Sequence, residues 1–152
     1  MHTKHFFPEE EGFYEETWFD REPEHFGIIE VRGVKIGFLL CTEIWFTQYA
    51  RKYGLAGVDF LLCPRATGKA SIPQWIRCGQ TSALISGSYC LSSNRSGMGD
   101  TNFEWGGTGW ICSPITGELL GTTSAENPYV TIDIDLEQSK LAKKEYPLYV
   151  RD

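Results

Sequence analysis

Hydrophobic and polar residues follow two different rhythms along this chain, and each rhythm predicts its own kind of element. Two apolar runs, at residues 34–40 and 58–63, are nearly continuous, which predicts strands that are covered on both faces. Residues 27–31 precede the first run across the two-residue turn Arg32-Gly33. This arrangement predicts a β-hairpin whose second strand enters the interior of the protein.

Apolar residues at helical spacing predict two helices in the middle of the chain, over residues 44–54 and 71–86. Before the hairpin, residues 5–25 are broken by proline and glycine and predict irregular structure. Beyond the second helix the pattern predicts strands at 89–94, 108–113 and 129–134, a loop at 95–107 and a charged terminal helix at 136–145. Helices and strands alternate and then strands dominate, which predicts a single α/β domain over residues 1–152, without internal repeats.

Composition and charge narrow the class of protein. Apolar residues make up 41% and charged residues 22% of the chain, as in ordinary globular domains. The net charge of −6 is opposite to that of a typical nucleic-acid binder. No apolar run approaches the roughly 20 residues of a membrane span, and none follows the N-terminus as in a signal peptide. We therefore expect no nucleic-acid or membrane partner and a cytoplasmic location.

The five cysteines lie at positions 41, 63, 78, 90 and 112. Their number is odd and no two have the C-x-x-C spacing of zinc sites, so neither a metal site nor a disulfide framework is predicted. Free thiols fit a reducing compartment, and most of them are expected to be small core residues.

Cys41 differs from the other cysteines because it lies where a predicted strand runs directly into a predicted helix. Such a junction lies at the carboxyl edge of the sheet, where open α/β sheets bind ligands. The helix that follows directs N–H groups and the positive end of its dipole at this junction, which favours a thiolate. The pattern alone leaves two interpretations open, a nucleophile and an inert core cysteine.

Several motifs in order resemble the nitrilase superfamily, the carbon–nitrogen hydrolases that include amidases, carbamoylases and nitrilases. The segments 37–46 and 57–64, GFLLCTEIWF and GVDFLLCP, are similar to the family's nucleophile strand, helix and following strand. The resemblance extends over nearly the whole chain. It includes the lysine motif at 3–8, the acidic site at 11–14 and the closing segments at 92–95, 105–109 and 132–136.

The resemblance implies a fold, the nitrilase-type α-β-β-α sandwich, and a reaction. Cys41 would attack the carbon of a small amide and form a covalent thioester, without metal or organic cofactor. Lys4 would favour the thiolate and stabilise the oxyanion, together with the backbone N–H of Thr42. Glu11 would position Lys4 or the substrate, with Glu9 and Glu10 as competitors for this role.

Three further residues are candidates for the oxyanion and substrate site. Glu43 lies two residues after the nucleophile, and Arg65 and Asn94 follow predicted strand ends at the same sheet edge. Arg65 would pair with a substrate carboxylate or with Glu43, or else form a structural ion pair. The structural alternative for Asn94 is hydrogen bonding within a loop.

The chain departs from the family at one catalytic position. The family's first glutamate, the general base, lies well upstream of the lysine, and no glutamate here follows that upstream motif. We therefore expect the carboxyl-terminal half of a nitrilase-type domain, with impaired activity, since a missing general base costs about 10²–10⁴-fold. The absent half would leave sheet edges and apolar faces uncovered, so we expect a homo-oligomer or a partner that supplies the N-terminal half.

Other functions remain open at this point. The same cysteine would also serve in hydrolysis of a nitrile, although Cys41-Thr42-Glu43 lacks the tryptophan that follows the nucleophile in nitrile-cleaving members. A catalytically inactive binding or assembly module is a second alternative. A thiol redox protein is a third, although no two cysteines are close in sequence.

Overall fold

A six-stranded mixed sheet forms the centre of the protein in the computed structural model, which describes residues 2–99 and 102–151. The strand order is β10-β9-β6-β5-β4-β3, and the pairs β4–β5 and β5–β6 are parallel. This sheet confirms the predicted α/β class. Its strands are β3 (Ile28–Val31), β4 (Val34–Phe38), β5 (Phe60–Arg65), β6 (Tyr89–Asn94), β9 (Trp110–Cys112) and β10 (Leu119–Thr122).

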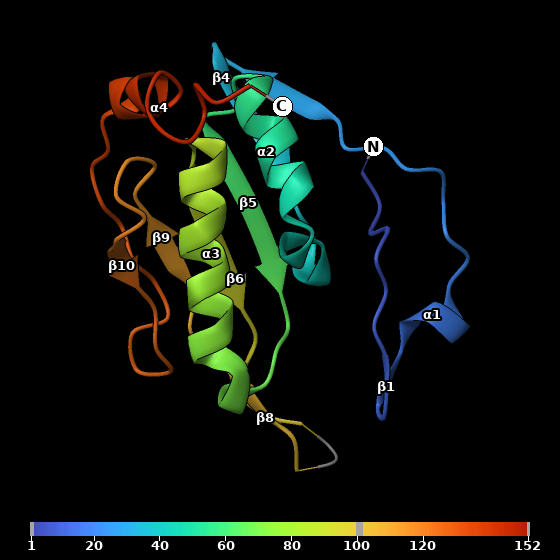
Figure 1. Ribbon diagram of the computed structural model, residues 1–152. Helices are drawn as coiled ribbons and strands as arrows, with labels where there is room; N and C mark the ends of the chain where they lie inside the picture. Colours follow the sequence, from blue (N-terminus) through green and yellow to red (C-terminus); the bar gives the residue numbers. More distant parts are fainter. Residues whose placement is uncertain (1, 100–101, 152) are drawn as a thin grey trace.

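Two helices, α2 (Thr47–Leu55) and α3 (Ile72–Ser86), lie side by side on one face of this sheet (Figure 1). Their backbones come very close at Gly54, where an added Cβ would lie 2.5 Å from the carbonyl oxygen of Ser86. Helix α4 (Leu136–Ala142) lies at the end of the sheet opposite the carboxyl ends of β4 and β5 (Figure 1). The core between helices and sheet includes Leu39, Ile44, Ala50, Val58, Leu61, Cys63, Ala83 and Trp110.

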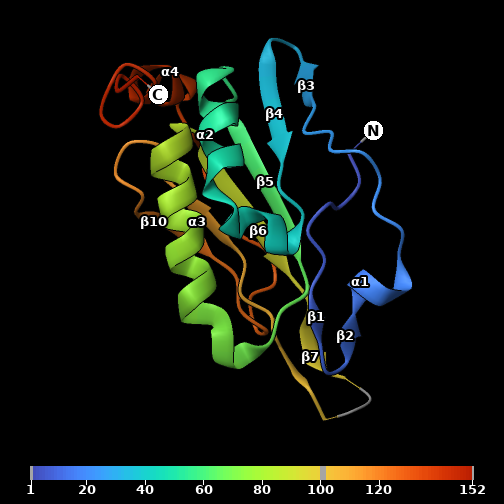
Figure 2. The ribbon, with the colours of Figure 1, turned by 45° about the vertical axis from the view of Figure 1, so that its right-hand side comes forward.

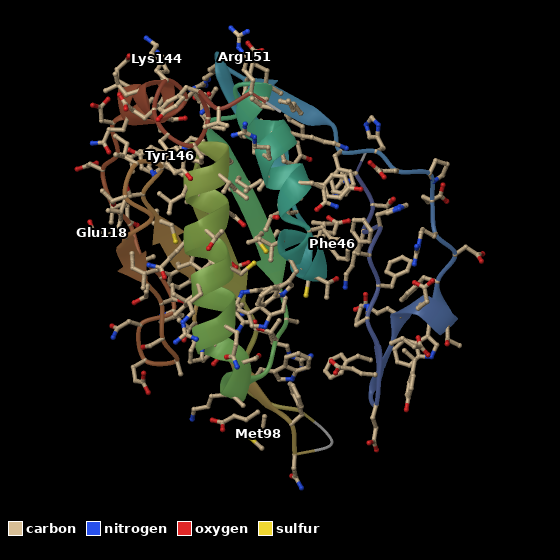
Figure 3. The ribbon with its side chains drawn as sticks, in the orientation of Figure 1. Phe46, Met98, Glu118, Lys144, Tyr146 and Arg151 are labelled. Atoms are coloured by element: carbon tan, nitrogen blue, oxygen red, sulfur yellow. The ribbon has the colours of Figure 1, made fainter. Side chains whose placement is uncertain are left out.

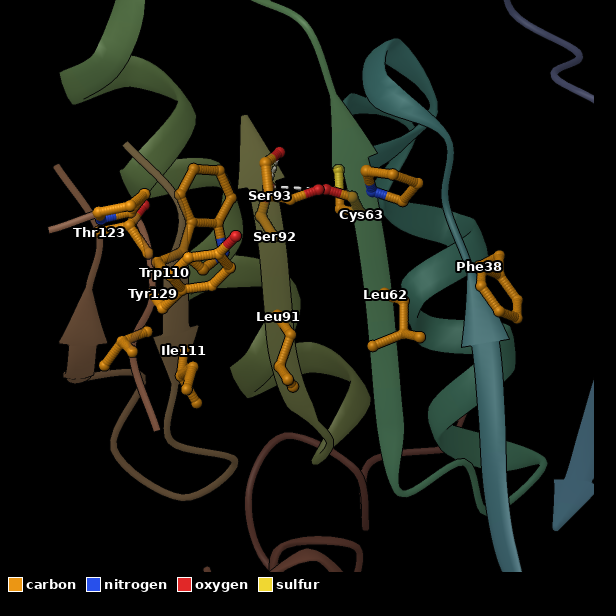
Figure 4. Close-up of a pocket in the computed structure, with 13 residues that line it drawn as sticks. Phe38, Leu62, Cys63, Leu91, Ser92, Ser93, Trp110, Ile111, Thr123 and Tyr129 are labelled. Carbon is orange, nitrogen blue, oxygen red and sulfur yellow. Dashed lines mark hydrogen bonds between the residues drawn. The ribbon is translucent and has the colours of Figure 1, made fainter. Parts of the chain in front are cut away.

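The other face of the sheet is apolar and only partly covered. Phe38, Leu62, Leu91 and Ile111 project from four adjacent strands on the side away from the helices (Figure 4). They line an open hollow of about 410 Å³. Strand β3 continues this face, and its outermost side chains Ile29 and Val31 are 52% and 50% exposed. The described residues thus form a layer of helices on a sheet whose second apolar face is left open.

The N-terminal segment forms a short arm beside the carboxyl ends of β4 and β5 (Figure 2). It contains a hairpin of β1 (Glu9–Glu10) and β2 (Phe13–Tyr14), followed by one helical turn, α1 (Glu15–Trp18). Gly12 takes φ +83° in the hairpin turn. The ring of Phe13 packs against Phe103 and Trp105, with ring centres 5.4 and 5.8 Å away.

Four predictions differ in the structure. Residues 5–25, expected to be irregular, contain β1, β2 and α1. The helix expected over 44–54 is divided at Phe46 into a 3₁₀ turn, η1 (Cys41–Trp45), and α2. The loop expected over 95–107 includes a hairpin of β7 (Ser96–Met98) and β8 (Glu104–Gly106). The strand expected over 129–134 is absent from the described structure.

The apolar alternation over 129–134 has a different origin. Val130 and Ile132 lie against Gly121 of β10, where an added Cβ would meet their methyl groups at 2.7 and 3.7 Å. The alternation therefore reflects side chains that pack on an edge strand without ladder hydrogen bonds. Among the described residues, no helix combines the length and the apolar character needed to cross a membrane.

Candidate active site

Cys41 occupies a strained turn between β4 and η1. Its φ of +52° lies in the left-handed region, which costs a residue with a side chain about 1–2 kcal/mol. Such strain persists only where the surrounding structure enforces it. The Cys41 side chain is half-buried, whereas the other four cysteines are buried. The backbone therefore presents this thiol, of the five, toward solvent.

A buried carboxylate two residues further on holds this turn. Glu43 is 0% exposed, and its Oε2 accepts a hydrogen bond of 2.7 Å from the backbone N–H of Leu40. The carboxylate thus bridges the residue before the nucleophile and the turn after it. Glu43 does not line the cavity at Cys41.

The same carboxylate binds the N-terminal arm. Glu43 Oε1 accepts a hydrogen bond of 2.6 Å from the backbone N–H of His5, and Oε2 lies 2.7 Å from Nε2 of His2. Thr42 Oγ1 donates a hydrogen bond to the carbonyl oxygen of Phe6. The two residues that follow the nucleophile therefore fix the backbone on both sides of position 4.

Stacked aromatic rings strengthen this attachment. The ring of Phe6 stacks on Phe46 with centres 3.7 Å apart, and Phe26 stacks on Tyr49 at 3.9 Å. Phe46 faces the arm from the end of α2 nearest the nucleophile (Figure 3). The arm is thus docked at its beginning and at its end.

Lys4 is directed to the edge of the Cys41 cavity. Its Nζ lies 2.5 Å from Oε2 of Glu15, and its side chain is only 16% exposed. Glu15 lines the cavity that also contains Cys41 and Thr42. The structure therefore brings Lys4 to a carboxylate that borders the thiol's cavity.

Glu11 is placed differently from what the resemblance implied. It is exposed in the turn between β1 and β2 and does not line the cavity. The hairpin reverses the chain at Gly12, which turns Glu11 outward and returns Glu15 to Lys4. Glu9, the first competitor, accepts hydrogen bonds from the N–H and Oγ1 of Thr17, whereas Glu10 lines the cavity.

The cavity at Cys41 has a volume of about 250 Å³, large enough for a small molecule. One wall comes from the N-terminal arm, another from the loop after β5, and a third from α3 and the segment before β8. Its lining residues are Pro8, Glu10, Phe13, Glu15, Cys41, Thr42, Ala66, Thr67, Gly68, Ala70, Ser71, Trp75 and Phe103.

Arg65 is a structural residue in this arrangement. Its Nε donates to Ser92 Oγ at 3.0 Å, and its two terminal nitrogens donate to Thr67 Oγ1 and to the carbonyl oxygen of Thr108. The guanidinium therefore donates to hydroxyl and carbonyl oxygens, in place of the expected pairing with Glu43 or with a substrate carboxylate. The guanidinium is nine-tenths buried and burial lowers its pKa to about 10.

Two tryptophan rings complete the surroundings of this guanidinium. Its Cζ lies 4.3 Å from the ring centre of Trp110 and 5.5 Å from that of Trp75. The aromatic faces stabilise a cation that no carboxylate pairs with in the described structure. Because Trp75 also lines the cavity, Arg65 supports one of its walls from behind.

Asn94 has a similar supporting role. Its Oδ1 accepts a hydrogen bond of 2.9 Å from the backbone N–H of Thr67, and its Nδ2 donates to the carbonyl oxygen of the same residue. Thr67 and Gly68 line the cavity, so Asn94 shapes the loop that forms its wall. The described residues contain no ion pair of Arg65, which was its structural alternative, whereas Asn94 hydrogen-bonds within the loop after β5 as its structural alternative stated.

The remaining cysteines have a different chemistry. Burial raises the pKa of Cys78 to about 11 and that of Cys112 to about 12. Burial also raises the pKa of Cys63 and of Cys90 well above the ordinary value of a thiol. These four thiols remain protonated near neutral pH, which leaves Cys41 as the candidate nucleophile.

Comparisons with known proteins identify the family of this chain. The family model of carbon-nitrogen hydrolases matches residues 2–144. An N-carbamoylputrescine amidase of Arabidopsis thaliana is 27% identical over 157 residues, which cover 92% of this chain and 52% of the relative. A 2-oxoglutaramate amidase of Bacillus subtilis is 25% identical over 123 residues, 81% of this chain and 47% of the relative.

Solved structures share the fold. A carbon-nitrogen hydrolase from Helicobacter pylori superimposes with a TM-score of 0.86 at 23% identity, over 96% of this chain and 55% of that one. A Saccharomyces cerevisiae member of branch 10 of the nitrilase superfamily gives 0.82 at 17% identity, over 97% and 52%. The chain thus spans about half the length of the proteins that it matches. It belongs to the carbon-nitrogen hydrolase family.

Proposed function

We propose that this chain carries the nucleophile of an amidase and cleaves the carbon–nitrogen bond of a small amide through Cys41. One observation supports this most strongly. The half-buried thiol lies on a positive-φ turn in a cavity that also contains a carboxylate paired with Lys4. A nucleophile, a neighbouring cation and a binding space are what covalent amide hydrolysis requires.

The reaction takes place in two steps. The Cys41 sulfur attacks the amide carbon, and the carbonyl oxygen becomes an oxyanion that Lys4 and the backbone N–H of Thr42 stabilise. The C–N bond then breaks, the amine leaves with a proton, and a thioester remains on Cys41. Water attacks this thioester, which gives the carboxylic or carbamic acid and restores the thiol.

Glu15 acts on Lys4 in this scheme. Their contact of 2.5 Å holds the lysine at the carboxylate that borders the cavity. Glu43 and Thr42 act earlier, because they attach the arm that carries the lysine. We therefore assign catalysis to Cys41 and Lys4 and positioning to Glu15 and Glu43.

We also propose that the second step is slow in this chain by itself. None of its glutamates matches the upstream motif of the family's general base, and a missing base costs about 10²–10⁴-fold. The open sheet face with Phe38, Leu62, Leu91 and Ile111 supports a need for a further layer. Two-state unfolding of a monomer that turns over amides at full rate would refute this part.

Trapping of the thioester tests the proposal. The protein is incubated with a series of small amides, quenched in acid, digested and examined by mass spectrometry. A slow second step makes the acyl group accumulate, so the peptide with Cys41 is expected to gain the acyl mass. A Cys41→Ser variant serves as the control for this assignment.

The outcomes separate the alternatives. A binding or assembly module leaves Cys41 unmodified while the protein remains folded. A nitrilase modifies Cys41 with nitriles but not with amides. A redox protein instead forms a disulfide after peroxide treatment, a result that the buried, protonated state of the other four thiols disfavours.

A further inference from the structure

We infer that Arg65 is a positioning residue whose buried positive charge stabilises the thiolate of Cys41 from behind the cavity wall. The inference deepens the proposed function and rests on it, because it adds a residue to the same site. Three features of the molecule support it. They are a cation without an opposite charge, a short path from this cation to the nucleophile, and the balance of charges on the other side of the cavity.

The guanidinium of Arg65 is a buried charge whose neighbours are neutral. The residue is 7% exposed, and its acceptors are the hydroxyl oxygens of Ser92 and Thr67 and the carbonyl oxygen of Thr108. Over residues 2–99 and 102–151, no carboxylate forms an ion pair with it. Burial of a charge is costly unless an opposite charge accompanies it. The structure therefore retains a cation that a nearby anion would stabilise.

Strand β5 brings this cation toward the nucleophile. Side chains two residues apart on a strand share a face, so Arg65 follows Cys63 on the buried face of β5. The thiol of Cys63 in turn donates a hydrogen bond of 3.9 Å to the carbonyl oxygen of Cys41. Two residues of a strand span about 7 Å, which puts the guanidinium on the order of 10 Å from the nucleophile.

Two residues of the cavity wall connect the charge to the surroundings of the thiol. Trp75 and Thr67 line the cavity of Cys41, and both contact the guanidinium. The Cζ atom of Arg65 lies 5.5 Å from the ring centre of Trp75, and one terminal nitrogen donates to Thr67 Oγ1. Burial lowers the pKa of Arg65 to about 10, and the thiols of Cys63 and Cys41 act on it in the opposite direction. The cation and the nucleophile thus interact through a buried wall, where salt screens charges less than at the surface.

The charges on the arm side of the cavity do not replace this cation. The Nζ atom of Lys4 lies 2.5 Å from Oε2 of Glu15, so these two charges balance each other. Two further carboxylates lie at the cavity and in the turn, those of Glu10 and, beside His2, Glu43. Ionisation of Cys41 adds another negative charge to this group. Arg65 is the cation behind the wall that no carboxylate neutralises in the described structure.

The pH profile of Cys41 alkylation tests the inference without turnover. Iodoacetamide is neutral and reacts with the thiolate, whose sulfur forms a bond to the methylene carbon while iodide leaves. Mass spectrometry of the peptide that contains Cys41 measures the rate at each pH. An opposite unit charge about 10 Å away, at an effective dielectric constant of about 20, changes an ionisation equilibrium about tenfold.

Three variants separate charge from structure. Arg65→Met removes the charge and is expected to move the midpoint of the profile upward by about one pH unit. Arg65→Lys loses the same three hydrogen bonds but keeps the charge, so its midpoint is expected to stay within about half a unit of wild type. Arg77→Met, at an exposed position of α3, is the charge-matched control and should leave the midpoint unchanged. Equal midpoints for wild type and Arg65→Met, or equal shifts for Arg65→Met and Arg65→Lys, would overturn the inference.

A comparison on the wild-type side chain decides if the Arg65 variants do not fold. Iodoacetate and iodoacetamide add groups of nearly equal shape to Cys41, but the carboxymethyl group is anionic and the carbamidomethyl group is neutral. The carboxymethyl protein is expected to unfold at a higher urea concentration at pH 7, because its anion accompanies the buried cation. The difference should persist in Lys4→Gln/Glu15→Gln, which removes both members of the other ion pair. A carboxymethyl protein of equal or lower stability, or a difference that this double variant abolishes, would contradict the role of Arg65.

These outcomes are distinct from those of the proposed hydrolysis. A thioester trapped on Cys41, together with a profile that Arg65→Met leaves unchanged, refutes the role of Arg65 and leaves the hydrolase proposal intact. A shifted profile in a protein that no amide acylates refutes the hydrolase proposal and leaves the role of Arg65 intact.

Discussion

Replacement of Glu43 by glutamine tests how the nucleophile and the N-terminal arm are held together. The carboxylate accepts hydrogen bonds from the backbone N–H groups of Leu40 and His5, and Nε2 of His2 lies 2.7 Å from it. A glutamine has one acceptor oxygen, so its amide N–H₂ must face at least one of these donors. Loss of one charge-assisted hydrogen bond and burial of one unpaired donor cost together about 3–5 kcal/mol.

The assay combines unfolding in urea with limited trypsin digestion. Glu43→Gln is expected to lower the free energy of unfolding by about 3 kcal/mol or more and to accelerate cleavage after Arg21 by about 100-fold, since 1.36 kcal/mol corresponds to a factor of ten. Glu30→Gln on exposed β3 is the charge-matched control and should change stability by less than about 0.5 kcal/mol. Equal cleavage of wild type and Glu43→Gln would show that this carboxylate does not hold the N-terminal arm.

The remaining predictions concern three other contacts. Glu15→Gln is expected to slow acylation of Cys41 by about tenfold or more, because a charge-assisted hydrogen bond to Lys4 is lost, and Glu11→Gln is expected to have a smaller effect. A mass-spectrometric time course measures both rates, and a larger effect of Glu11→Gln would assign the positioning of Lys4 to Glu11. Arg65→Lys keeps the charge but loses the arrangement of three hydrogen bonds that the guanidinium donates. The free energy of unfolding in urea should therefore fall by about 2 kcal/mol, and an unchanged unfolding midpoint would contradict this. Burial lowers the pKa of Lys143 to about 8, whereas an unfolded lysine has about 10.4. The unfolded state therefore binds more protons between these pH values, and wild-type stability should rise relative to Lys143→Met from pH 8 to pH 10; parallel stability curves would exclude this linkage.

Local patterns predicted much of the fold. The Arg32-Gly33 pair predicted the hairpin, and both residues take the positive φ values, 53° and 79°, that a primed turn requires. The strand expected at 89–94 agrees with β6, and the second helix agrees with α3. These elements are determined by neighbours in sequence, which is why pattern alone located them.

The candidate site depended on contacts between distant residues. The junction at Cys41 was visible as a strand that enters a helix, but the choice between Glu11 and Glu15 depends on how a hairpin folds back. Glu43 contacts His5 and His2, which lie 38 and 41 positions before it in the sequence, and no local spacing indicates such contacts. The sequence shows Arg65 as a cation at a strand end, but two of its acceptors, Ser92 and Thr108, lie 27 and 43 positions away.

The proposed reaction requires the Lys4 ammonium and the Cys41 sulfur to lie side by side in one site, and ortho-phthalaldehyde reports whether they do. This reagent joins one primary amine and one thiol into a fluorescent isoindole, with loss of two waters, when the two groups lie side by side. We expect an isoindole that bridges Lys4 and Cys41 in the native protein and is absent from both Lys4→Arg and Cys41→Ser. Native protein in which Cys41 forms no such bridge, or bridges to a different lysine, would contradict it.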